Sequence, residues 1–271
     1  MPELPEVETI CRGLQPHATN CRIDKLDIYQ PKLRYPLEPN LSQKLQGQTI
    51  LAIERRAKYL ILTLSTDFLL IHFGMSGFFR VYDEKTTKAK HDHVIFQLSN
   101  KKFLHYNDTR RFGFILYFDG KDALTQYLAS LAPEPLSRQF NVKYLENTLS
   151  RTKSSIKTVL MNNKVVVGVG NIYAQESLFK AGISPLRPAN ALSHVEAKSL
   201  LNIIKKTLNT AICQGGTTLK DFSHTDGKPG YFKQQLKVYG RANQPCFKCH
   251  TKLKEIKQSG RTTCFCPKCQ H

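Results

Sequence analysis

Two residues at the start of the chain could do covalent chemistry. Proline in second place is small enough for Met1 to be trimmed, which would leave Pro2 with a free secondary amine. The pKa of a chain-terminal amine is about 7.7–8.0, so a useful fraction is neutral and nucleophilic near pH 7. A secondary amine that attacks a carbonyl-like carbon gives an iminium, which keeps its positive charge until it is hydrolysed. Glu3 and Glu6 lie beside this amine as candidate proton carriers.

The same residues also have a simpler interpretation. Pro2 could limit fraying of the chain, while Glu3, Glu6 and Glu8 could cap a helix, because acidic side chains stabilise a helix N-terminus. Taken alone, the first eight residues favour this structural role. Whether they also take part in catalysis depends on what the rest of the chain indicates about a substrate.

Cysteines near the other end of the chain have the spacing of a tetrahedral metal site. Two Cys-x2-Cys pairs flank residues 250–265, and each pair can reach one ion from a tight turn. Two disulfides are a poorer interpretation for a chain with lone thiols and no leader. We therefore expect one structural Zn²⁺, since four thiolates leave no position for substrate, held by Cys246, Cys249, Cys266 and Cys269.

The segment between the two cysteine pairs should fold as a β-hairpin. Ser259-Gly260 predicts its turn, which leaves Arg261 on or beside the tip. Cys264 lies two residues before Cys266 and would share its face of a strand. We expect Cys264 to be a bystander and not a ligand.

Three further stretches carry cationic or large apolar side chains at turns. Lys58 lies in a basic run and could contact a phosphate or the reacting sugar, although such a run is usually a solvated edge. Two glycine-hinged turns, 72–77 and 108–113, present Met75 and Phe112. Such loops could wedge into a base stack while an arginine replaces the base that left it. Ordinary hairpin turns, with both side chains folded onto the core, are an equally good interpretation.

The charge balance indicates a polyanionic partner. The 271 residues include 40 Lys and Arg against 21 Asp and Glu, a formal net charge of +19. Such an excess favours nucleic acid or an anionic membrane. We expect no membrane partner, because the chain shows no long apolar run, no signal peptide and no long basic amphipathic helix. Nucleic acid is the favoured partner.

The elements that must position these residues follow two patterns. A helix is predicted over about 5–15, and short apolar or alternating runs separated by turn residues then continue to residue 118, as in an antiparallel sandwich. These runs are Ile23 to Ile28, Thr49 to Ile53, Tyr59 to Leu64, Phe68 to Phe73, Val94 to Leu98 and Phe114 to Phe118.

Beyond Pro133 and Pro135 the pattern becomes helical. Helices are predicted over 142–149 with an Asn141 cap, over 156–161, over 172–180, and from Ser193 to about 214. We therefore predict an α+β chain of three domains: a catalytic β-sandwich with a leading helix (1–133), a helical DNA-binding domain (134–235) and a four-Cys zinc finger (236–271).

Many of these motifs resemble those of the bacterial formamidopyrimidine-DNA glycosylases, the base-excision enzymes for oxidised purines. The resemblance runs from end to end, with the motifs in the family's order. They are Pro2 to Glu8, Arg55 to Tyr59, Gly74 to Gly77, Lys90 to His93, Arg110 to Gly113, Leu131 to Leu136, Val166 to Tyr173, Gln214 to Phe222, Asp226 to Phe232, Val238 to Arg241 and the four cysteines. Leu4 and the stretch 215–232, the loop expected to cover a flipped base, point away from the related endonuclease VIII family.

The resemblance implies a fold and a set of roles. The fold is a β-sandwich joined to a helix–two-turn–helix domain and a zinc-finger hairpin, with double-stranded DNA between them. The reaction is that of a bifunctional DNA glycosylase and AP lyase, which removes 8-oxoguanine and formamidopyrimidines through a Schiff base and β,δ-elimination. The implied catalytic residues are Pro2, Glu3, Glu6, Lys58 and Arg261. The implied DNA contacts are His91, Arg110, Lys153 and Asn171, with Met75, Arg111 and Phe112 as void-filling and wedge residues.

A second class of function fits the residues without the resemblance. A non-catalytic, zinc-dependent DNA-binding protein needs the basic excess and the zinc module but not Pro2, Glu3 or Lys58. For the enzyme, the expected partner is DNA containing oxidised purines or abasic sites. We expect a monomer in the bacterial cytoplasm, associated with the nucleoid through its DNA binding.

Overall fold

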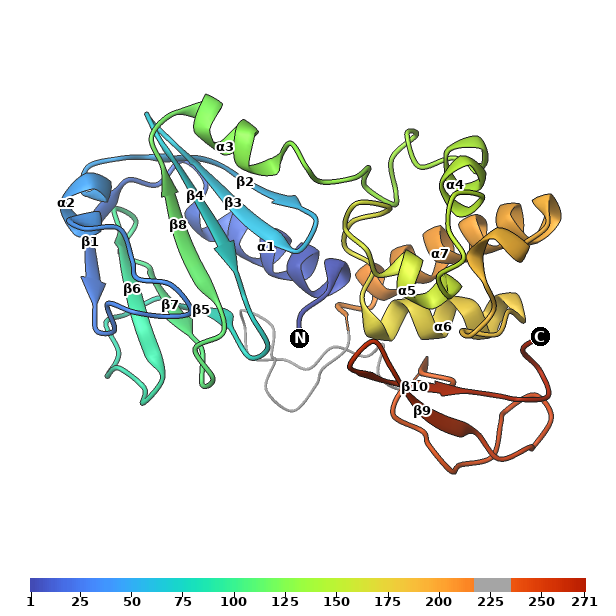
Figure 1. Ribbon diagram of the computed structural model, residues 1–271. Coiled ribbons are helices and arrows are strands. Elements are labelled where there is room, and N and C mark those ends of the chain that lie inside the picture. Colours follow the sequence, from blue (N-terminus) through green and yellow to red (C-terminus); the bar gives the residue numbers. More distant parts are fainter. Residues whose placement is uncertain (217–234) are drawn as a thin grey trace. The chain divides into compact units, whose positions relative to one another are not determined.

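The structure is a computed structural model in which residues 1–216 and 235–271 are described (Figure 1). The described residues form two compact units. Unit 1 comprises residues 1–130 and 214–216, and unit 2 comprises residues 131–213 and 235–271. Among these residues no helix combines the length and apolar character needed to cross a bilayer. Most of the loop expected over 215–232 lies outside the described residues.

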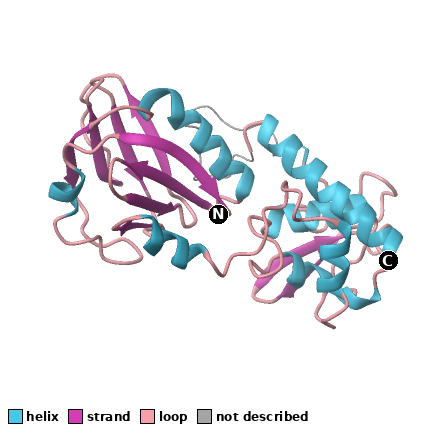
Figure 2. Cartoon of the chain, turned by 90° about the horizontal axis from the view of Figure 1, so that it is seen from above, coloured by secondary structure: helices cyan, strands magenta, loops and turns pink. Residues whose placement is uncertain are grey.

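Unit 1 contains two four-stranded antiparallel sheets, with strand orders β1-β6-β7-β5 and β2-β3-β4-β8. Figure 2 shows the strands of this unit in magenta and its helices in cyan. The strands are β1 (Ile23–Ile28), β2 (Ile50–Arg56), β3 (Tyr59–Leu64), β4 (Phe68–His72), β5 (Phe78–Tyr82), β6 (Asp92–Leu98), β7 (Phe103–Asn107) and β8 (Phe114–Phe118). Six of them coincide with the apolar runs of the sequence. Strands β5 and β7 were not among those runs, because Arg80 and the buried His105 interrupt their apolar character.

The core of unit 1 lies between the sheets and against the first helix. Helix α1 (Leu4–Ala18) packs on β2, β3 and β5, and its Val7, Ile10 and Leu14 are fully buried. It runs past the predicted end at residue 15, through Pro16. A proline in the last turn removes only one backbone hydrogen bond, so the helix can continue to Ala18.

The two central strands of the second sheet, β3 and β4, are buried on both faces. Leu60 and Leu62 of β3 face the main core, whereas Ile61 and the neighbouring Leu70 pack with Leu124 on the opposite side. Leu124 belongs to helix α3 (Lys121–Leu128), which the sequence did not predict. The short helix α2 (Leu41–Leu45), also not predicted, packs on β1. Coverage of both faces explains why β3 and β4 are continuous apolar runs and do not alternate.

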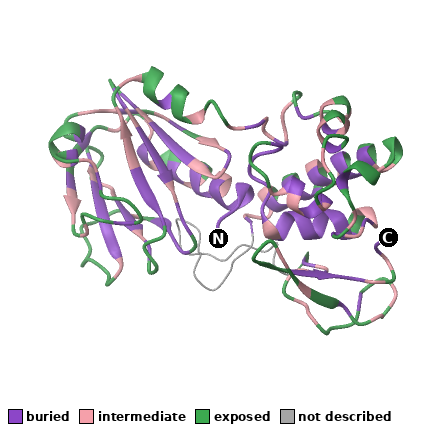
Figure 3. Ribbon diagram, viewed as in Figure 1, coloured by how far each residue is buried: buried purple, intermediate pink, exposed green. Residues whose placement is uncertain are grey.

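Unit 2 combines helices with one hairpin. The helices are α4 (Val142–Leu149), α5 (Ile156–Leu160), α6 (Asn171–Ala181), the 3-10 turn η1 (Ala189–Ala191) and α7 (His194–Cys213), and the strands are β9 (Lys254–Gln258) and β10 (Arg261–Phe265). Helix α6 is buried around most of its surface (Figure 3) and contacts α5, α7 and β10, so it forms the centre of this unit.

The predicted helix ends were largely correct. The Asn141 side chain accepts a hydrogen bond from the Tyr144 N–H at 3.0 Å, as an N-cap should. Ser193 and Glu196 form the predicted capping box of α7. Helix α6 begins one residue earlier than expected, with Gly170 at the N-cap. Asn171 is therefore inside the helix, and its side chain bonds elsewhere.

Candidate active site and metal centre

The first turn of α1 fixes the acidic residues next to Pro2. Pro2, Glu3 and Glu6 are buried, and the Glu6 carboxylate accepts the Glu3 backbone N–H at 2.9 Å. This bond is one arm of a capping box, so the structural role considered for these acids is real. Gly216 lies against Glu6: a Cβ at that glycine would be 2.9 Å from Glu6 Oε1. The capping geometry also holds two carboxyl groups beside the first residues of the chain.

Lys58 is placed by a two-residue turn between β2 and β3. Arg56 pairs with Tyr59 across the hairpin, and Ala57 adopts a left-handed φ of 56°. Arg55 Nη1 donates to the Ala57 carbonyl at 3.1 Å, and this hydrogen bond stabilises the turn. The basic run is therefore a structured turn with a half-buried Lys58 and not a fully solvated edge.

Helix α1 and this turn are joined through Glu8. Its carboxylate accepts hydrogen bonds from Arg55 Nε and Arg12 Nε, each at 2.8 Å. Burial alone would raise the pKa of the Glu8 carboxyl, but the bonds from Arg55 and Arg12 hold that pKa below its ordinary value. Glu8 is therefore charged at neutral pH and links the helix after Pro2 to the hairpin of Lys58.

His72 lies at the end of β4 and is a neighbour of Lys58. Burial, with the nearby charges of Lys58 and Arg34, lowers the pKa of His72 to about 4. The neutral ring stacks on Phe114 with centroids 5.1 Å apart. Its Nδ1 accepts the Gly74 N–H at 3.1 Å. His72 thus connects the surroundings of Lys58 with the loop that carries Met75.

The two glycine-hinged loops meet at their backbones. A Cβ at Gly74, whose φ is +57°, would lie 2.3 Å from the Gly113 backbone nitrogen. Beyond this crossing, Met75 is 40% exposed and Phe112 is 45% exposed. The Arg110 guanidinium lies 5.0 Å from the centroid of the Phe112 ring. Both large apolar side chains are therefore at the surface, and neither is folded onto the core.

In unit 2, segments that carry predicted DNA contacts are bonded to the turn end of the hairpin. Asn171 Nδ2 donates to the carbonyl of Thr262 at 3.0 Å, directly after Arg261. Gln258 Nε2 donates to Ser155 Oγ at 2.6 Å, so the start of α5, just after Lys153, is also tied to the hairpin. Lys153 and Arg261 are both exposed.

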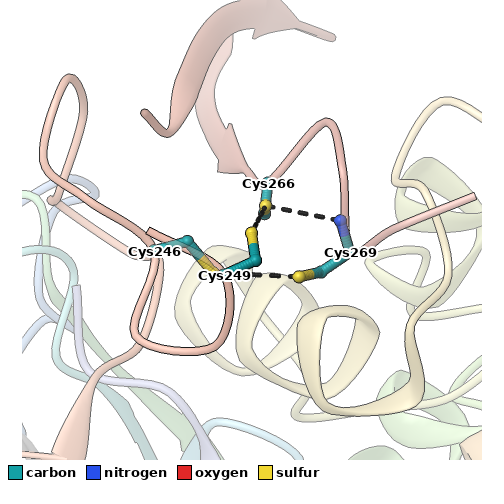
Figure 4. A group of neighbouring side chains, drawn as sticks. All are labelled: Cys246, Cys249, Cys266 and Cys269. Atoms are coloured by element: carbon teal, nitrogen blue, oxygen red, sulfur yellow. Dashed lines mark hydrogen bonds between the residues drawn. The ribbon is translucent and has the colours of Figure 1, made fainter. Parts of the chain in front are cut away.

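The four predicted cysteines form one cluster (Figure 4), with all Sγ atoms within 4.8 Å of one another. The Cys249–Cys266 and Cys246–Cys269 sulfurs are 3.5 and 4.0 Å apart. A tetrahedral ion with bonds of about 2.3 Å requires sulfurs about 3.8 Å apart, so the cluster fits Zn²⁺. Backbone N–H groups also point at the sulfurs of Cys246 and Cys266, as expected for thiolates.

Cys264 does not belong to this cluster. Its Sγ donates to the Glu255 carboxylate at 3.6 Å, across the hairpin pair that joins the two residues. The metal-ligating group found among the described residues consists of Cys246, Cys249, Cys266 and Cys269 alone.

The family follows from comparison with known proteins. The sequence matches the model of the formamidopyrimidine-DNA glycosylase N-terminal domain over residues 1–115 and that of the H2TH domain over residues 131–223. The chain belongs to the formamidopyrimidine-DNA glycosylase family. Its members are DNA glycosylases that act on damaged DNA, and so is this chain.

Relatives in this family cover the whole chain. The formamidopyrimidine-DNA glycosylase of Hahella chejuensis is 49% identical over 270 residues, and that of Vibrio cholerae serotype O1 is 50% identical over 271 residues. In each case 100% of both chains is covered.

Solved structures agree with the fold. The MutM (Fpg) protein of Thermus thermophilus has a TM-score of 0.88 at 34% identity, covering 99% of this chain and 98% of that one. A Lactococcus lactis Fpg mutant bound to DNA containing Fapy-dG has a TM-score of 0.92 at 32% identity, with both chains fully covered. The predicted α+β organisation is confirmed: a sandwich with a leading helix, an H2TH domain and a four-cysteine hairpin.

Four polar residues that hold this framework, three of them buried and one half-buried, had no assigned role in the sequence analysis. They are His72, Asp108, Lys157 and Glu176. The Glu176 carboxylate accepts the N–H groups of Lys237, Val238 and Tyr239, and Lys157 Nζ donates to Thr263 Oγ1 at 2.6 Å. Sequence carries only one signal for such residues, a charged or polar type inside an otherwise apolar run, and that signal does not name the partner.

Proposed function

We propose that this chain is a bifunctional DNA glycosylase and AP lyase that removes 8-oxoguanine and formamidopyrimidines. The observation that carries the proposal is the fixed pair of Glu3 and Glu6 beside Pro2 in a member of this family. Structural relatives support the substrate class, because they were solved with DNA containing Fapy-dG, an abasic site or carbocyclic 8-oxo-G.

The first step needs the secondary amine of Pro2, which becomes available when Met1 is removed. The Pro2 nitrogen bonds to C1′ of the damaged nucleotide, the glycosidic bond breaks, and the base leaves with its bonding electrons and a proton. Glu3 acts as the general acid and base at the sugar, and Glu6 supports it by holding the Glu3 backbone. Opening of the sugar ring gives the iminium.

The iminium then acts as the electron sink for two eliminations. Loss of a C2′ proton expels the 3′ phosphate and leaves an unsaturated iminium, and loss of a C4′ proton from it expels the 5′ phosphate. Lys58 assists the eliminations and holds phosphate, and Arg261 assists the second elimination and binds the DNA backbone. Both side chains also favour the developing phosphate charge.

The remaining predicted residues bind DNA. His91, Arg110, Lys153 and Asn171 contact the backbone, which positions the duplex without reading its sequence. Met75, Arg111 and Phe112 fill the gap left by the flipped nucleotide. Flipping a nucleotide out of the duplex costs a few kcal/mol, which these side chains, the pocket and the phosphate contacts offset.

One Zn²⁺ held by the four cysteines would be structural. Bound there, the ion would hold together the two turns that carry the cysteine pairs, and so would fix the base of the hairpin that carries Arg261. We further propose the three-domain division at 133/134 and 235/236, a monomeric state, and action in the bacterial cytoplasm on double-stranded DNA.

Borohydride trapping tests the chemistry. Reduction of the iminium should leave a covalent protein–DNA adduct on an 8-oxoguanine duplex, whereas a non-catalytic DNA-binding protein would give none. Pro2→Gly, which keeps a primary amine, should be severely impaired, and a chain that retains Met1 should not trap. A Glu84→Gln variant, altered far along the chain at an exposed site, is the matched control and should trap normally. Robust trapping with Met1 attached would overturn the amine assignment.

A further inference from the structure

Asp108 is fully buried and directly follows β7, at the foot of the loop that carries Arg110 and Phe112. Its carboxylate spans the two glycine-hinged loops. Oδ1 accepts the Ser76 hydroxyl at 2.6 Å, and Oδ2 accepts the Gly113 N–H at 2.8 Å. Ser76 directly follows Met75, and Gly113 directly follows Phe112, so one carboxylate sets the spacing of the two exposed apolar side chains.

The same residue also holds a third segment. The Asp108 N–H donates to the carbonyl of His91 at 3.1 Å, and the Asp108 carbonyl accepts a bond from His93 Nε2 at 2.8 Å. Three segments that each carry a proposed DNA contact, Met75, His91 and Phe112, therefore meet at one side chain and its peptide groups. All of these bonds lie within unit 1.

A short hydrogen-bond triangle tightens this junction. The Arg110 backbone N–H donates to Ser76 Oγ at 3.1 Å and to Asp108 Oδ1 at 3.3 Å. The carboxylate thus faces donors only, and the Ser76 hydroxyl both donates to it and accepts from Arg110. Hydrogen bonds to a buried carboxylate are strong, and together they hold the donor groups of the two loops in one geometry.

We propose that Asp108 is the positioning residue that presets the void-filling loops for base flipping. The inference rests on the proposed function and deepens it. Met75 and Phe112 can offset the cost of unstacking only if they are held at the right spacing before the base leaves. Asp108 fixes that spacing through its hydrogen bonds to Ser76 and Gly113, the residues that follow them. Because Asp108 is fully buried, its proposed role is to position the loops and not to take part in the bond changes at C1′.

The position requires an aspartate because every group that bonds the Asp108 side chain is a hydrogen-bond donor. Asparagine has the same shape but only one acceptor oxygen. If its amide nitrogen faces Ser76, the Ser76 hydroxyl hydrogen and the Arg110 N–H lose the acceptor they share in Asp108. If it faces Gly113, the Gly113 N–H loses its acceptor. In either orientation at least one buried donor is left unsatisfied. Asp108→Asn should therefore loosen the loops without removing any DNA contact.

The test uses the full-length, zinc-loaded enzyme with Met1 removed. A duplex carries an abasic-site analogue with 2-aminopurine in the opposite strand, so insertion of the loops changes the fluorescence. In Asp108→Asn the amplitude should fall by at least half, and excision of 8-oxoguanine should slow by about tenfold or more. Borohydride trapping at a preformed abasic site should change by less than about threefold, because no base has to be unstacked there.

Two further variants separate positioning from a general loss of stability. Asp67→Asn also removes a buried, hydrogen-bonded carboxylate, but at the β3–β4 turn, and it should leave the fluorescence amplitude unchanged. In a Phe112→Ala background, Asp108→Asn should have less than about a threefold further effect on excision, because residues that act together are not additive.

Three results would overturn the inference. They are a normal fluorescence amplitude in Asp108→Asn, a full tenfold effect that persists in the Phe112→Ala background, and an equal loss in Asp67→Asn. If the unaltered enzyme changes the fluorescence but never traps, the proposed lyase chemistry is wrong, and the Asp108 inference is still decided by the fluorescence amplitudes.

Discussion

Glu8 on α1 and Arg55 on β2 form an ion pair with 2.8 Å between Oε2 and Nε. The Arg55 side chain is only 10% exposed, and its Nη1 also donates to the carbonyl of Ala57 in the turn before Lys58. The pair therefore links the helix that begins after Pro2 to the hairpin that carries the proposed elimination residue. Two pieces of the site that are far apart in sequence depend on one carboxylate.

Replacing Glu8 by glutamine should test this link. Glu8→Gln keeps the shape but removes the charge, so the free energy of unfolding should fall by about 1–2 kcal/mol in urea titrations. Glu38→Gln is the control, since its pair with Lys44 is more exposed and should be worth less than about 1 kcal/mol. Equal losses in the two variants would contradict the linking role. Trapping should also slow in Glu8→Gln only.

Gly74 should not tolerate alanine. Its φ of +57° disfavours a side chain, and a Cβ would meet the backbone of Gly113 and Phe112 at 2.3 Å. Backbone cannot yield like the end of a flexible side chain, so Gly74→Ala should lower the free energy of unfolding by about 3 kcal/mol or more. Gly182→Ala provides the control, because its φ is +72° in the ordinary left-handed region and the nearest atom to the added Cβ, the Cys269 carbonyl oxygen, lies at 3.5 Å. It should cost about 1 kcal/mol. A thermal unfolding series would show whether the two differ.

The pKa of His72 gives a pH dependence of stability. It is lowered to about 4 by burial and by Lys58 and Arg34, so between pH 6.5 and 4 the unfolded chain binds a proton that the folded chain does not. The stabilisation is complete above about pH 6.5, falls as the pH is lowered, and is lost by about pH 4, a change of up to about 3 kcal/mol.

Urea unfolding at pH 7.0 and 4.5 measures this dependence. His72→Asn keeps an acceptor for the Gly74 N–H but cannot titrate, so its stability should fall less between the two pH values. Carboxyls with lowered pKa, such as Asp92 and Glu196, contribute equally to both chains and cancel in the comparison. Identical pH dependences would contradict the assignment to His72.

Loss of one cysteine ligand should release the metal. Cys246→Ser should reduce zinc per chain from about one to near zero, because structural sites need all four ligands. Cys264→Ser is the internal control and should retain zinc, since its sulfur bonds Glu255 instead. DNA binding should weaken in the first variant, through the hairpin that carries Arg261. Metal analysis that finds equal zinc in both would count against the four-cysteine site.

DNA affinity should depend strongly on salt. If about five phosphates are contacted, a plot of log affinity against log salt should have a slope near −4 to −5. Removing the charge of Arg110 or Lys153 should make that slope less negative by about one unit each. A flat dependence would exclude the proposed phosphate contacts.

The sequence predicted most of the local structure and the chemical types at the site. Apolar runs marked six of the eight strands of unit 1, and capping residues marked the starts of α4 and α7. The cysteine spacing predicted the metal cluster, because two tight turns with fixed spacing almost determine their own geometry. The family resemblance named the remaining residues.

Only the tertiary structure decided what holds those residues in place. Nothing local distinguishes Asp108, His72 or Glu176 from ordinary polar residues, because their partners lie on other strands, loops or helices. The tertiary structure also decided that Met75 and Phe112 are exposed. The sequence had fitted exposed and core-packed side chains equally well.

At the N-terminus, Glu3 and Glu6 cap α1 and are also the acids proposed for catalysis. The structural and catalytic interpretations of these residues are therefore compatible. Local patterns depend on neighbours in the chain, whereas the ties between loops depend on contacts that exist only after the sheets have paired.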